Sequence, residues 1–377
     1  MQHADCIIIG LGGVGSAAAY HLAVRGVRVL GLDQFPIAHD RGSSHGSTRV
    51  IRQAYFEHPD YVPLLSRAYE LWTALETQSA QRLFDPVGAL QMGPANGVVI
   101  PGVIASATQH QLTIEKFSHA DLRNKFPQFH PDDNMIGVLE SNAGFLHVEA
   151  CVQAHATLAT QHGAQLRTDE IVREWSAANG AVRVVTDRTT YTAARLVIAA
   201  GAWSSQLLRD LHIPLVVKRK PLFWFSTHDT SYAAAHGAPC FLFETRDGIF
   251  YGTPQIDARG VKLAEHTGGE IVTNPLHVDR TLHAAEAIRI AAACAHYLPR
   301  AVAQHSDHSV CMYTMSPDEN FIIDHHPDHA TVTFAAGLSG HGFKFTSVLG
   351  EILADLSTHE KSPLPIEFLS VQRLKKN

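Results

Sequence analysis

Cysteine is scarce in this sequence, and long hydrophobic runs are missing. The 377 residues contain five cysteines, an odd and widely spaced set (Cys6, Cys151, Cys240, Cys294, Cys311), which argues against a disulfide framework and for a reducing compartment. No stretch approaches the roughly 18 uncharged apolar residues that a membrane span needs, and the apolar start lacks the basic flank of a signal peptide. We therefore expect a cytoplasmic protein without a membrane segment.

Positive charge is not in excess either. The 30 Lys and Arg against 36 Asp and Glu give a net charge of −6, which is too acidic for a strong electrostatic footprint on nucleic acid. The 25 His are scattered, and no HExxH or paired CxxC spacing groups them, so we expect no metal site. With 45% hydrophobic and 18% charged residues, the composition excludes disorder as the main state.

The most informative segment lies at the start of the chain. A short apolar strand, Cys6 to Ile9, runs into Gly10-Leu11-Gly12-Gly13-Val14-Gly15 and then into an Ala-rich helix from Ser16 to about Arg25. A second strand, Val27 to Leu32, ends at Asp33, where a carboxylate can accept the hydroxyls of an adenosine ribose. Strand, glycine turn, helix and acidic residue together predict dinucleotide binding, with a doubly wound fold lacking a ligand as the alternative.

This motif does not separate a nicotinamide from a flavin cofactor, because both present the same adenosine diphosphate. A further strand, Arg195 to Ala200, runs into Gly201, where a small-residue turn suits a second approach of the backbone to an extended cofactor. A simple turn between a strand and a helix explains Gly201 equally well.

The rest of the chain indicates a mixed α/β organisation. Helical spacing of apolar residues predicts helices over residues 60–77, 148–162 and 347–356, and strand-like stretches cover 215–226, 239–251 and 331–334. We expect a Rossmann-type α/β nucleotide-binding domain with an inserted substrate domain that contains a mixed or antiparallel sheet. The boundaries are placed at 1–82, 147–216 and 325–377 for the first domain, and at 83–146 and 217–324 for the second.

Four further segments carry a family resemblance over essentially the full chain. They are Gly42-Ser43-Ser44-His45-Gly46-Ser47-Thr48-Arg49-Val50-Ile51-Arg52, Tyr251-Gly252-Thr253-Pro254 with Lys262 and His266, Cys311-Met312-Tyr313-Thr314 through Asp318 to Asp324, and Gly337-Leu338-Ser339-Gly340-His341-Gly342-Phe343-Lys344. Together and in this order they resemble the monomeric sarcosine oxidase and N-methyltryptophan oxidase family of flavin amine oxidases, with the tryptophan enzymes more similar. The resemblance implies that FAD is the cofactor.

Within that family, FAD is attached through a thioether to the flavin 8α-methyl, and the cysteine of the pattern corresponds to Cys311. Attachment needs a thiolate as the nucleophile. Without the resemblance, we would expect Cys311 to be a small apolar residue buried in the core. The resemblance further implies that FAD contacts these residues: Gly10, Gly12, Gly13, Val14, Gly15, Asp33, Ser44, His45, Arg49, Val172, Gly201, Cys311, Met312, Gly340, Gly342 and Lys344.

The resemblance also implies roles in catalysis. Arg52 and Lys344 match the pair that binds the substrate carboxylate, for which a guanidinium and an ammonium are fitting partners. Lys262 matches the lysine that promotes the reaction of reduced flavin with O₂. Tyr251 and His266 match residues on the substrate side.

His45 and Arg49 match residues beside the flavin ring, where cations stabilise negative charge. Family members often carry Asp where this chain has Ser47. This departure leaves His45, Arg49 and Arg52 in register, but a local ion pair or hydrogen bond is expected to differ.

The expected activity is an FAD-dependent oxidation of N-methyl amino acids of the N-methyl-L-tryptophan or sarcosine type, which gives the amino acid, formaldehyde and H₂O₂. The expected partners are a small amino-acid substrate and O₂, and the expected form is a monomer. Three alternatives remain open at this point: oxidation of a cyclic secondary amino acid such as pipecolate, an NAD-dependent dehydrogenase, and a non-catalytic flavin-binding protein.

Overall fold

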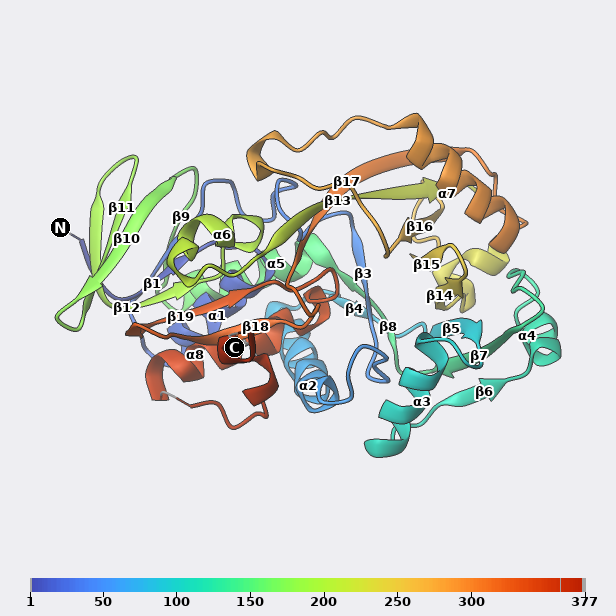
Figure 1. Cartoon of the computed structure of the whole chain (residues 1–377), viewed down its shortest axis with the longest axis horizontal. Coiled ribbons are helices and arrows are strands. Elements are labelled where there is room, and N and C mark those ends of the chain that lie inside the picture. The colour runs from blue at the N-terminus through green and yellow to red at the C-terminus, as the bar shows by residue number, and fades with distance from the viewer. Residues whose placement is uncertain (1, 360, 375–377) are drawn as a thin grey trace.

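Two eight-stranded sheets organise the chain, as the computed structural model shows for residues 2–359 and 361–374 (Figure 1). The first sheet has the order β10-β11-β12-β1-β2-β9, with β19 pairing β12 and β18 pairing β19. Its strands are β1 Gln2–Ile9, β2 Val29–Leu32, β9 Gln165–Arg167, β10 Val172–Ala178, β11 Ala181–Thr186, β12 Thr190–Ile198, β18 Ile322–His326 and β19 His329–Ala336. The central strands β9, β2, β1, β12 and β19 run parallel, as a nucleotide-binding sheet requires.

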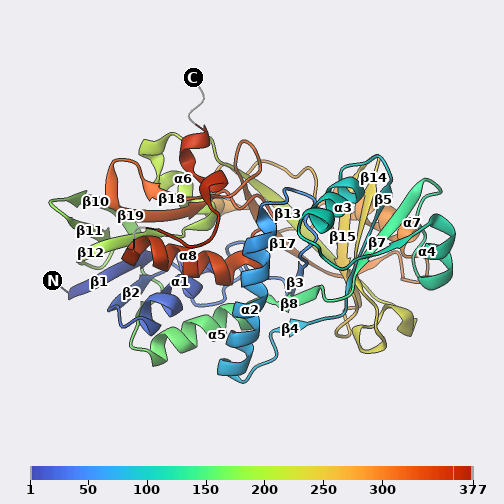
Figure 2. The same cartoon turned by 90° about the horizontal axis from the view of Figure 1, so that it is seen from below.

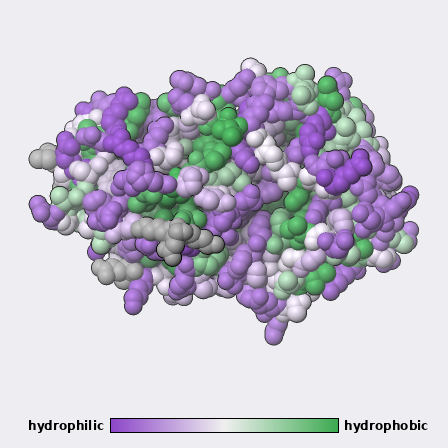
Figure 3. All heavy atoms as spheres, in the orientation of Figure 1, coloured by the Kyte–Doolittle hydropathy of each residue, from purple (hydrophilic) through white to green (hydrophobic). Residues whose placement is uncertain are grey.

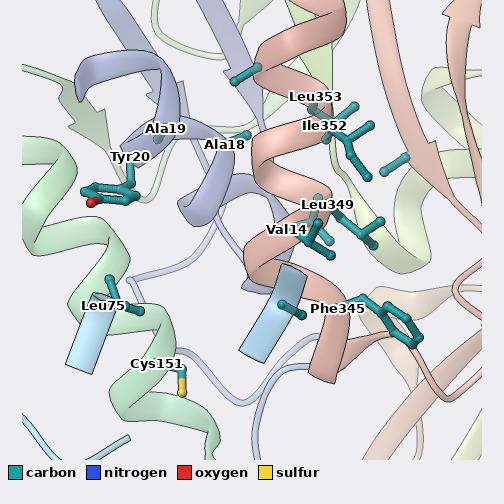
Figure 4. Packing of buried hydrophobic residues seen from close by; sticks show 14 of the residues in the cluster. Val14, Ala18, Ala19, Tyr20, Leu75, Cys151, Phe345, Leu349, Ile352 and Leu353 are labelled. Atoms are coloured by element: carbon teal, nitrogen blue, oxygen red, sulfur yellow. The ribbon is translucent and has the colours of Figure 1, made fainter. Parts of the chain in front are cut away.

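Four helices pack around the first sheet and build the largest core (Figure 4). They are α1 Gly13–Val24, α2 Tyr61–Ser79, α5 Val148–Gln161 and α8 Thr346–His359. Small residues let α1 and α8 approach closely, because a Cβ placed on Gly350 would lie 2.5 Å from Cβ of Ala17. The core therefore fixes the start of α1, and with it the glycine turn, against the C-terminal segment.

The second sheet has the order β17-β13-β16-β15-β14-β5-β7-β6. Its strands are β5 Ala89–Pro94, β6 Glu115–Phe117, β7 Met135–Glu140, β13 Val216–Phe225, β14 Cys240–Thr245, β15 Gly248–Thr253, β16 Val261–Glu265 and β17 His305–Met315. All its neighbours pair antiparallel except β14 and β5, which run parallel. The helices α3 Val99–Gln109, α4 His119–Lys125 and α7 Ala284–Tyr297 accompany this sheet (Figure 2).

Short elements complete the described part of the chain. A three-stranded sheet joins β3 Thr48–Ile51, β8 Gly144–His147 and β4 Phe84–Asp85. The remaining helix is α6 Ser204–Leu207, and 3-10 turns cover Gly201–Trp203, Arg209–Leu211, Thr230–Tyr232, Ala234–His236, Pro275–His277, Phe343–Phe345, Glu367–Leu369 and Val371–Leu374. Within the described ranges, no helix combines the length and the apolar character needed to cross a membrane. On the face drawn in Figure 3, hydrophilic side chains predominate and hydrophobic ones form separate groups between them.

Strand alternation gives the second sheet two different faces, because successive side chains of a strand point to opposite sides. One face is an aromatic and aliphatic core, formed by residues such as Leu90, Met92, Phe223, Phe241, Phe243, Phe250 and Leu263. The opposite face carries Leu222, Trp224, Tyr251, Ala264 and Cys311, which cluster with one another. The two residue sets interleave along the same strands, so the register decides which side chains reach the site.

The structure confirms the predicted α/β class, with one sheet whose central strands are parallel and a second, mixed sheet. The predicted first helix begins earlier, at Gly13, so the last glycines of the motif form its first turn. The stretch 239–251 divides into β14 and β15 around residues 246–247, at the turn that the sequence indicated. The domain boundaries stay a prediction, and residues 1, 360 and 375–377 of the expected first domain lie outside the described residues.

Candidate active site

A cavity of about 430 Å³ lies between the two large sheets and takes side chains from both. Most residues predicted for the site line it: Gly10, Gly12, Gly13, Val14, Asp33, Ser44, Arg49, Arg52, Val172, Gly201, Tyr251, His266, Met312, Gly340, Gly342 and Lys344. Four predicted residues, Gly15, His45, Lys262 and Cys311, do not line it. His45, Lys262 and Cys311 are buried, and Arg49 connects the cavity wall to the sulfur of Cys311.

The glycine turn leaves no room for side chains at two positions. Gly10 has a φ of +91°, and a Cβ there would lie 2.5 Å from the carbonyl oxygen of Ala199. A Cβ on Gly15 would lie 1.8 Å from the carbonyl oxygen of Gly10. Gly15 therefore packs against the backbone of Gly10 and does not line the cavity.

Asp33 ends β2 at the cavity, as the sequence predicts, and it is held by backbone groups. Its Oδ2 accepts a hydrogen bond from the Leu11 N–H at 2.7 Å, and its Oδ1 accepts one from the Phe35 N–H at 2.9 Å. Burial raises the pKa of Asp33 to about 6 although these hydrogen bonds act in the opposite direction. The carboxylate is therefore fixed in orientation beside the glycine turn.

Several buried polar atoms along the cavity have no hydrogen-bond partner among the described residues. They include Nε1 of Trp203, Oγ1 of Thr314, Oγ1 of Thr346, Oε2 of Glu170 and both amide atoms of Gln91, all in residues that line the cavity. Buried polar groups are normally paired. Unpaired atoms of this kind, beside a glycine turn at a helix N-terminus, fit a large polar ligand such as a dinucleotide.

Cys311 differs from the other four cysteines in its electrostatic environment. Burial alone raises the pKa of a thiol, and it does so at Cys6, Cys151, Cys240 and Cys294. At Cys311 the Arg49 guanidinium, with a contribution from His45, outweighs burial and lowers the pKa to about 6. Nη2 of Arg49 donates to Sγ of Cys311 at 3.2 Å. The thiolate, which is the nucleophilic form, therefore predominates at neutral pH.

Lys262 is a buried cation anchored by backbone oxygens. Its Nζ donates to the carbonyl oxygens of Gly46 at 2.8 Å and Thr48 at 2.7 Å, and it lies 5.7 Å from the ring centre of Trp224. Burial, and then the charge of Arg49, lower the pKa of Lys262 well below its usual value. A negative charge that forms nearby would relieve this cost and favour the ammonium form.

Arg52 and Lys344 are two buried basic residues that line the same cavity. Nη2 of Arg52 lies 3.0 Å from each carboxylate oxygen of Glu57, which also lines the cavity and was missed by the sequence analysis. Although burial would raise it, Arg52 and nearby cations hold the pKa of Glu57 at about 2. Burial and the charge of Arg52 lower the pKa of Lys344 to about 7.

Two more residues that received no role from the sequence complete this end of the site. Nζ of Lys344 donates to the carbonyl oxygen of His341 at 2.7 Å and to the hydroxyl of Tyr55 at 3.3 Å. The Tyr55 hydroxyl is in turn 2.6 Å from Nδ1 of His341. These contacts hold the ammonium of Lys344 in one place, so a carboxylate can meet a preorganised partner.

Tyr251 and His266 are neighbours that both line the cavity. The hydroxyls of Tyr251 and Tyr313 are 3.3 Å apart, and the rings of Tyr251 and His266 are 6.3 Å apart. Burial lowers the pKa of His266 to about 3, so this imidazole is neutral at neutral pH. Tyr313 belongs to the Cys311-Met312-Tyr313-Thr314 segment, which is the signal that could have assigned it to the site.

Ser47 takes part in a local network with Glu149 and Arg259. The Ser47 hydroxyl accepts a hydrogen bond from Nη2 of Arg259 at 2.8 Å, and the backbone N–H groups of Gly46 and Ser47 donate to Glu149 Oε1 at 2.7 and 3.1 Å. A neutral hydroxyl thus meets Arg259 at this position, and the carboxylates of Asp257 and Glu149 supply the nearby negative charge. An Asp at position 47 would meet Arg259 with a negative charge that Ser47 lacks, so the expected local difference stays a prediction about the partners of Arg259.

This combination of fold and cavity agrees with the comparison with known protein families. Residues 5–356 match the family described as FAD dependent oxidoreductase, and the chain belongs to this family. The match decides between the two cofactor classes that the glycine turn left open: the protein is an oxidoreductase that uses FAD.

Individual relatives place the chain more narrowly. It is 40% identical over 375 residues to a monomeric sarcosine oxidase of Streptomyces avermitilis, covering 98% of this chain and 97% of that protein. It is 37% identical over 374 residues to an N-methyl-L-tryptophan oxidase of Yersinia pestis, covering 98% and 99%. Among solved structures, NikD, described as an unusual amino acid oxidase, superposes with a TM-score of 0.87 at 24% identity, covering 98% of both chains, which shows the shared fold.

Proposed function

We propose that this protein is an FAD-dependent oxidase of N-methyl amino acids, which it converts with O₂ and water to the demethylated amino acid, formaldehyde and H₂O₂. The observation that carries the proposal is the joint placement of Arg52 and Lys344 in one cavity with Tyr251 and His266, next to the glycine turn. Two buried cations in one wall suit a carboxylate, and a neutral imidazole suits an amine that must lose its proton. The names of the two relatives support the same substrate class.

Each residue then has a distinct task. Arg52 and Lys344 bind the substrate carboxylate and thereby orient the amine and its N-methyl group. Tyr251 and neutral His266 border the amine and favour its unprotonated form, because a protonated amine is not a hydride donor. FAD bound in this cavity supplies a two-electron acceptor, and O₂ takes the electrons to give H₂O₂. Lys262 holds positive charge where negative charge develops during the reduction of O₂.

We further propose that Cys311 holds FAD through a thioether. Its thiolate character and its contact with Arg49 support this assignment, since a thiolate attacks an electron-poor carbon far faster than a thiol. In this linkage the C–S bond would replace one C–H bond of the flavin 8α-methyl. One proton would be lost, and the two electrons would pass to the flavin and from there to O₂, which gives H₂O₂. Glu170, Trp203, Thr314 and Thr346 would pair their free polar atoms with the bound cofactor. A monomer is proposed on the name of the sarcosine oxidase relatives, and a cytoplasmic location on the five cysteines, none of which forms a disulfide.

The test is the visible spectrum of the purified holoenzyme under anaerobic conditions, before and after addition of N-methyl-L-tryptophan, sarcosine or pipecolate. We expect the flavin band to bleach with at least one N-methyl amino acid, and formaldehyde to appear in equal amount to the flavin reduced. Bleaching by pipecolate alone would instead assign the enzyme to cyclic secondary amines. A flavin that none of the three compounds bleaches would contradict the proposal.

A further inference from the structure

Gln91 is a buried polar residue in the cavity without a hydrogen-bond partner. It lies in the middle of β5, its side chain is 1% exposed, and it lines the cavity. Neither Oε1 nor Nε2 of its amide has a partner among the described residues. A buried amide that makes no hydrogen bond is costly, and such a group in a ligand cavity points to a ligand that pairs with it.

The register places this amide on the reactive face of the second sheet. Gln91 is directly opposite Leu242 on β14, and Leu242 is directly opposite Tyr251 on β15. Opposed residues point to the same face, so Gln91, Leu242 and Tyr251 form one row across three strands. At one inter-strand spacing per step, Gln91 lies about 10 Å from Tyr251 along this row.

The flavin is not the partner that this geometry suggests. Cys311 lies on β17, five strands away from β5 in the sheet order. Five inter-strand spacings amount to about 24 Å along the sheet, so a ring system attached at the sulfur would have to extend across the four intervening strands to meet Gln91. The unpaired polar atoms of Trp203, Thr314 and Thr346, which we assign to the cofactor, belong to other segments of the cavity. We therefore assign the amide of Gln91 to the substrate.

We propose that Gln91 recognises the far end of the substrate side chain, and that the substrates are N-methyl amino acids with an apolar stem that ends in an N–H or O–H group. This inference rests on the proposed function. The stem would pass Leu242 and Phe56, two apolar residues in the cavity wall, and its terminal group would donate to Oε1 of Gln91. Sarcosine has no side chain, so it leaves the amide of Gln91 unpaired.

The buried amide of Gln91 affects substrate choice in two ways: it binds a ligand that donates a hydrogen bond to it, and it disfavours a ligand that leaves it unpaired. A ligand that fills the cavity with an apolar end keeps the amide of Gln91 buried and unpaired, whereas a donor at that end satisfies it. Sites built to bond a substrate N–H or O–H therefore discriminate strongly against analogues without it. Gln91→Leu is nearly isosteric. It removes both the hydrogen bond to a substrate donor and the free-energy cost of an unpaired buried amide.

The kinetic experiment uses the holoenzyme and a matched pair of substrates under anaerobic conditions. N-methyl-L-tryptophan is compared with its benzothiophene analogue, in which sulfur replaces the indole N–H. We expect wild-type enzyme to prefer the indole at least about 10-fold in the second-order rate constant for flavin reduction, and Gln91→Leu to bring the ratio to within about threefold. Met92→Leu, on the opposite face of the same strand, is the control and should retain the wild-type ratio.

A binding experiment separates this inference from the proposed function, since it needs no turnover. The perturbation of the flavin spectrum by indole acetate and by benzothiophene acetate gives two dissociation constants, and their ratio should again depend on Gln91. Equal affinities in wild type, or a ratio unchanged in Gln91→Leu and in the second variant Gln91→Met, would overturn the assignment. If no amine reduces the flavin, the proposed function fails, and the two acids alone decide the role of Gln91.

Discussion

Nη2 of Arg49 donates hydrogen bonds both to the sulfur of Cys311, at 3.2 Å, and to the carbonyl oxygen of Ser43, at 3.0 Å. The second bond fixes the guanidinium, so its charge stays against the sulfur. Sγ of Cys311 itself lies 3.3 Å from the same Ser43 oxygen. Among the groups that lower the pKa of Cys311, the Arg49 guanidinium makes the largest contribution, and His45 adds to it.

Replacement of Arg49 by Met should slow covalent attachment of the flavin. Without the guanidinium, burial raises the pKa of Cys311 from about 6 towards or above that of an ordinary thiol. The thiolate fraction at pH 7 then falls by about 30-fold or more, and the rate of attachment should fall with it. The measurement is the flavin retained by acid-precipitated protein over time after apoprotein is mixed with FAD.

Two further variants complete this test. Arg259→Met removes a cation that contacts Ser47 instead of the sulfur, and it should attach flavin at the wild-type rate. Cys311→Ala should release all its flavin into the acid supernatant. Flavin that still precipitates with Cys311→Ala would show that the linkage lies at another residue.

Lys262→Met should separate the two halves of the catalytic cycle. The variant loses the cation anchored on Gly46 and Thr48, so reoxidation by O₂ should slow by about 100-fold or more, while reduction by substrate changes by less than about threefold. Stopped-flow measurement of each half-reaction tests this.

Lys220→Met is the matched control for Lys262, because Lys220 is also a buried lysine bound to backbone carbonyls, those of His266 and Thr267. Its removal should lower thermal stability without a selective defect in reoxidation. Equal slowing of reduction and reoxidation in Lys262→Met would remove the oxygen role from that residue.

Arg52→Ala should weaken the binding of carboxylate ligands by about 100-fold or more, since a buried charge-assisted pair is lost and Glu57 keeps an unpaired carboxylate beside the site. Titration of the flavin spectrum with indole acetate gives the dissociation constant. Arg67→Ala, which removes a half-exposed arginine on α2, should bind the acid as wild type does. An unchanged affinity in Arg52→Ala would place the carboxylate elsewhere.

The binding of carboxylates should weaken as pH rises through about 7. Lys344 has its pKa lowered to about 7, so its ammonium is present below that pH and is lost above it. Each further pH unit should then weaken binding by up to about 10-fold, until the pKa of Lys344 in the complex is reached. His266 and His341 do not interfere, because burial lowers their pKa values to about 3 and about 4.

Lys344→Met provides the control for this pH profile. The variant should bind the acid weakly and with little dependence on pH between 6 and 9. A profile that keeps its slope in the variant would assign the titration to a different group.

The nucleotide-binding half of the fold was predictable because its signals are local. The glycine turn, the strands that flank it and Asp33 lie within a short stretch, and each follows from backbone geometry or from strand periodicity. The helices over 60–77, 148–162 and 347–356 were predictable for the same reason, and the structure places α2, α5 and α8 there.

The substrate end was much less predictable, since it depends on contacts between distant segments. The parallel pairing of β5 with β14 joins residues about 150 positions apart, and no local pattern specifies it. Glu57 entered the site through its pairing with Arg52, which requires the folded loop. Gln91 did carry a sequence signal, as a single polar residue within the apolar stretch Ala89–Met92. Only the pairing of β5 with β14, however, shows that its side chain lies on the cavity face of the sheet.

The alternation along the second sheet has a consequence for how this enzyme can change over evolution. Residues such as Met92 and Phe243 on one face maintain the fold, while their neighbours Gln91 and Leu242 line the cavity. Substitutions on the cavity face can therefore alter the range of accepted amines with little effect on folding stability. Positions 91 and 242 therefore offer a compact set for laboratory selection of new substrates, and neither carries a role in the proposed chemistry at Cys311 and Lys262.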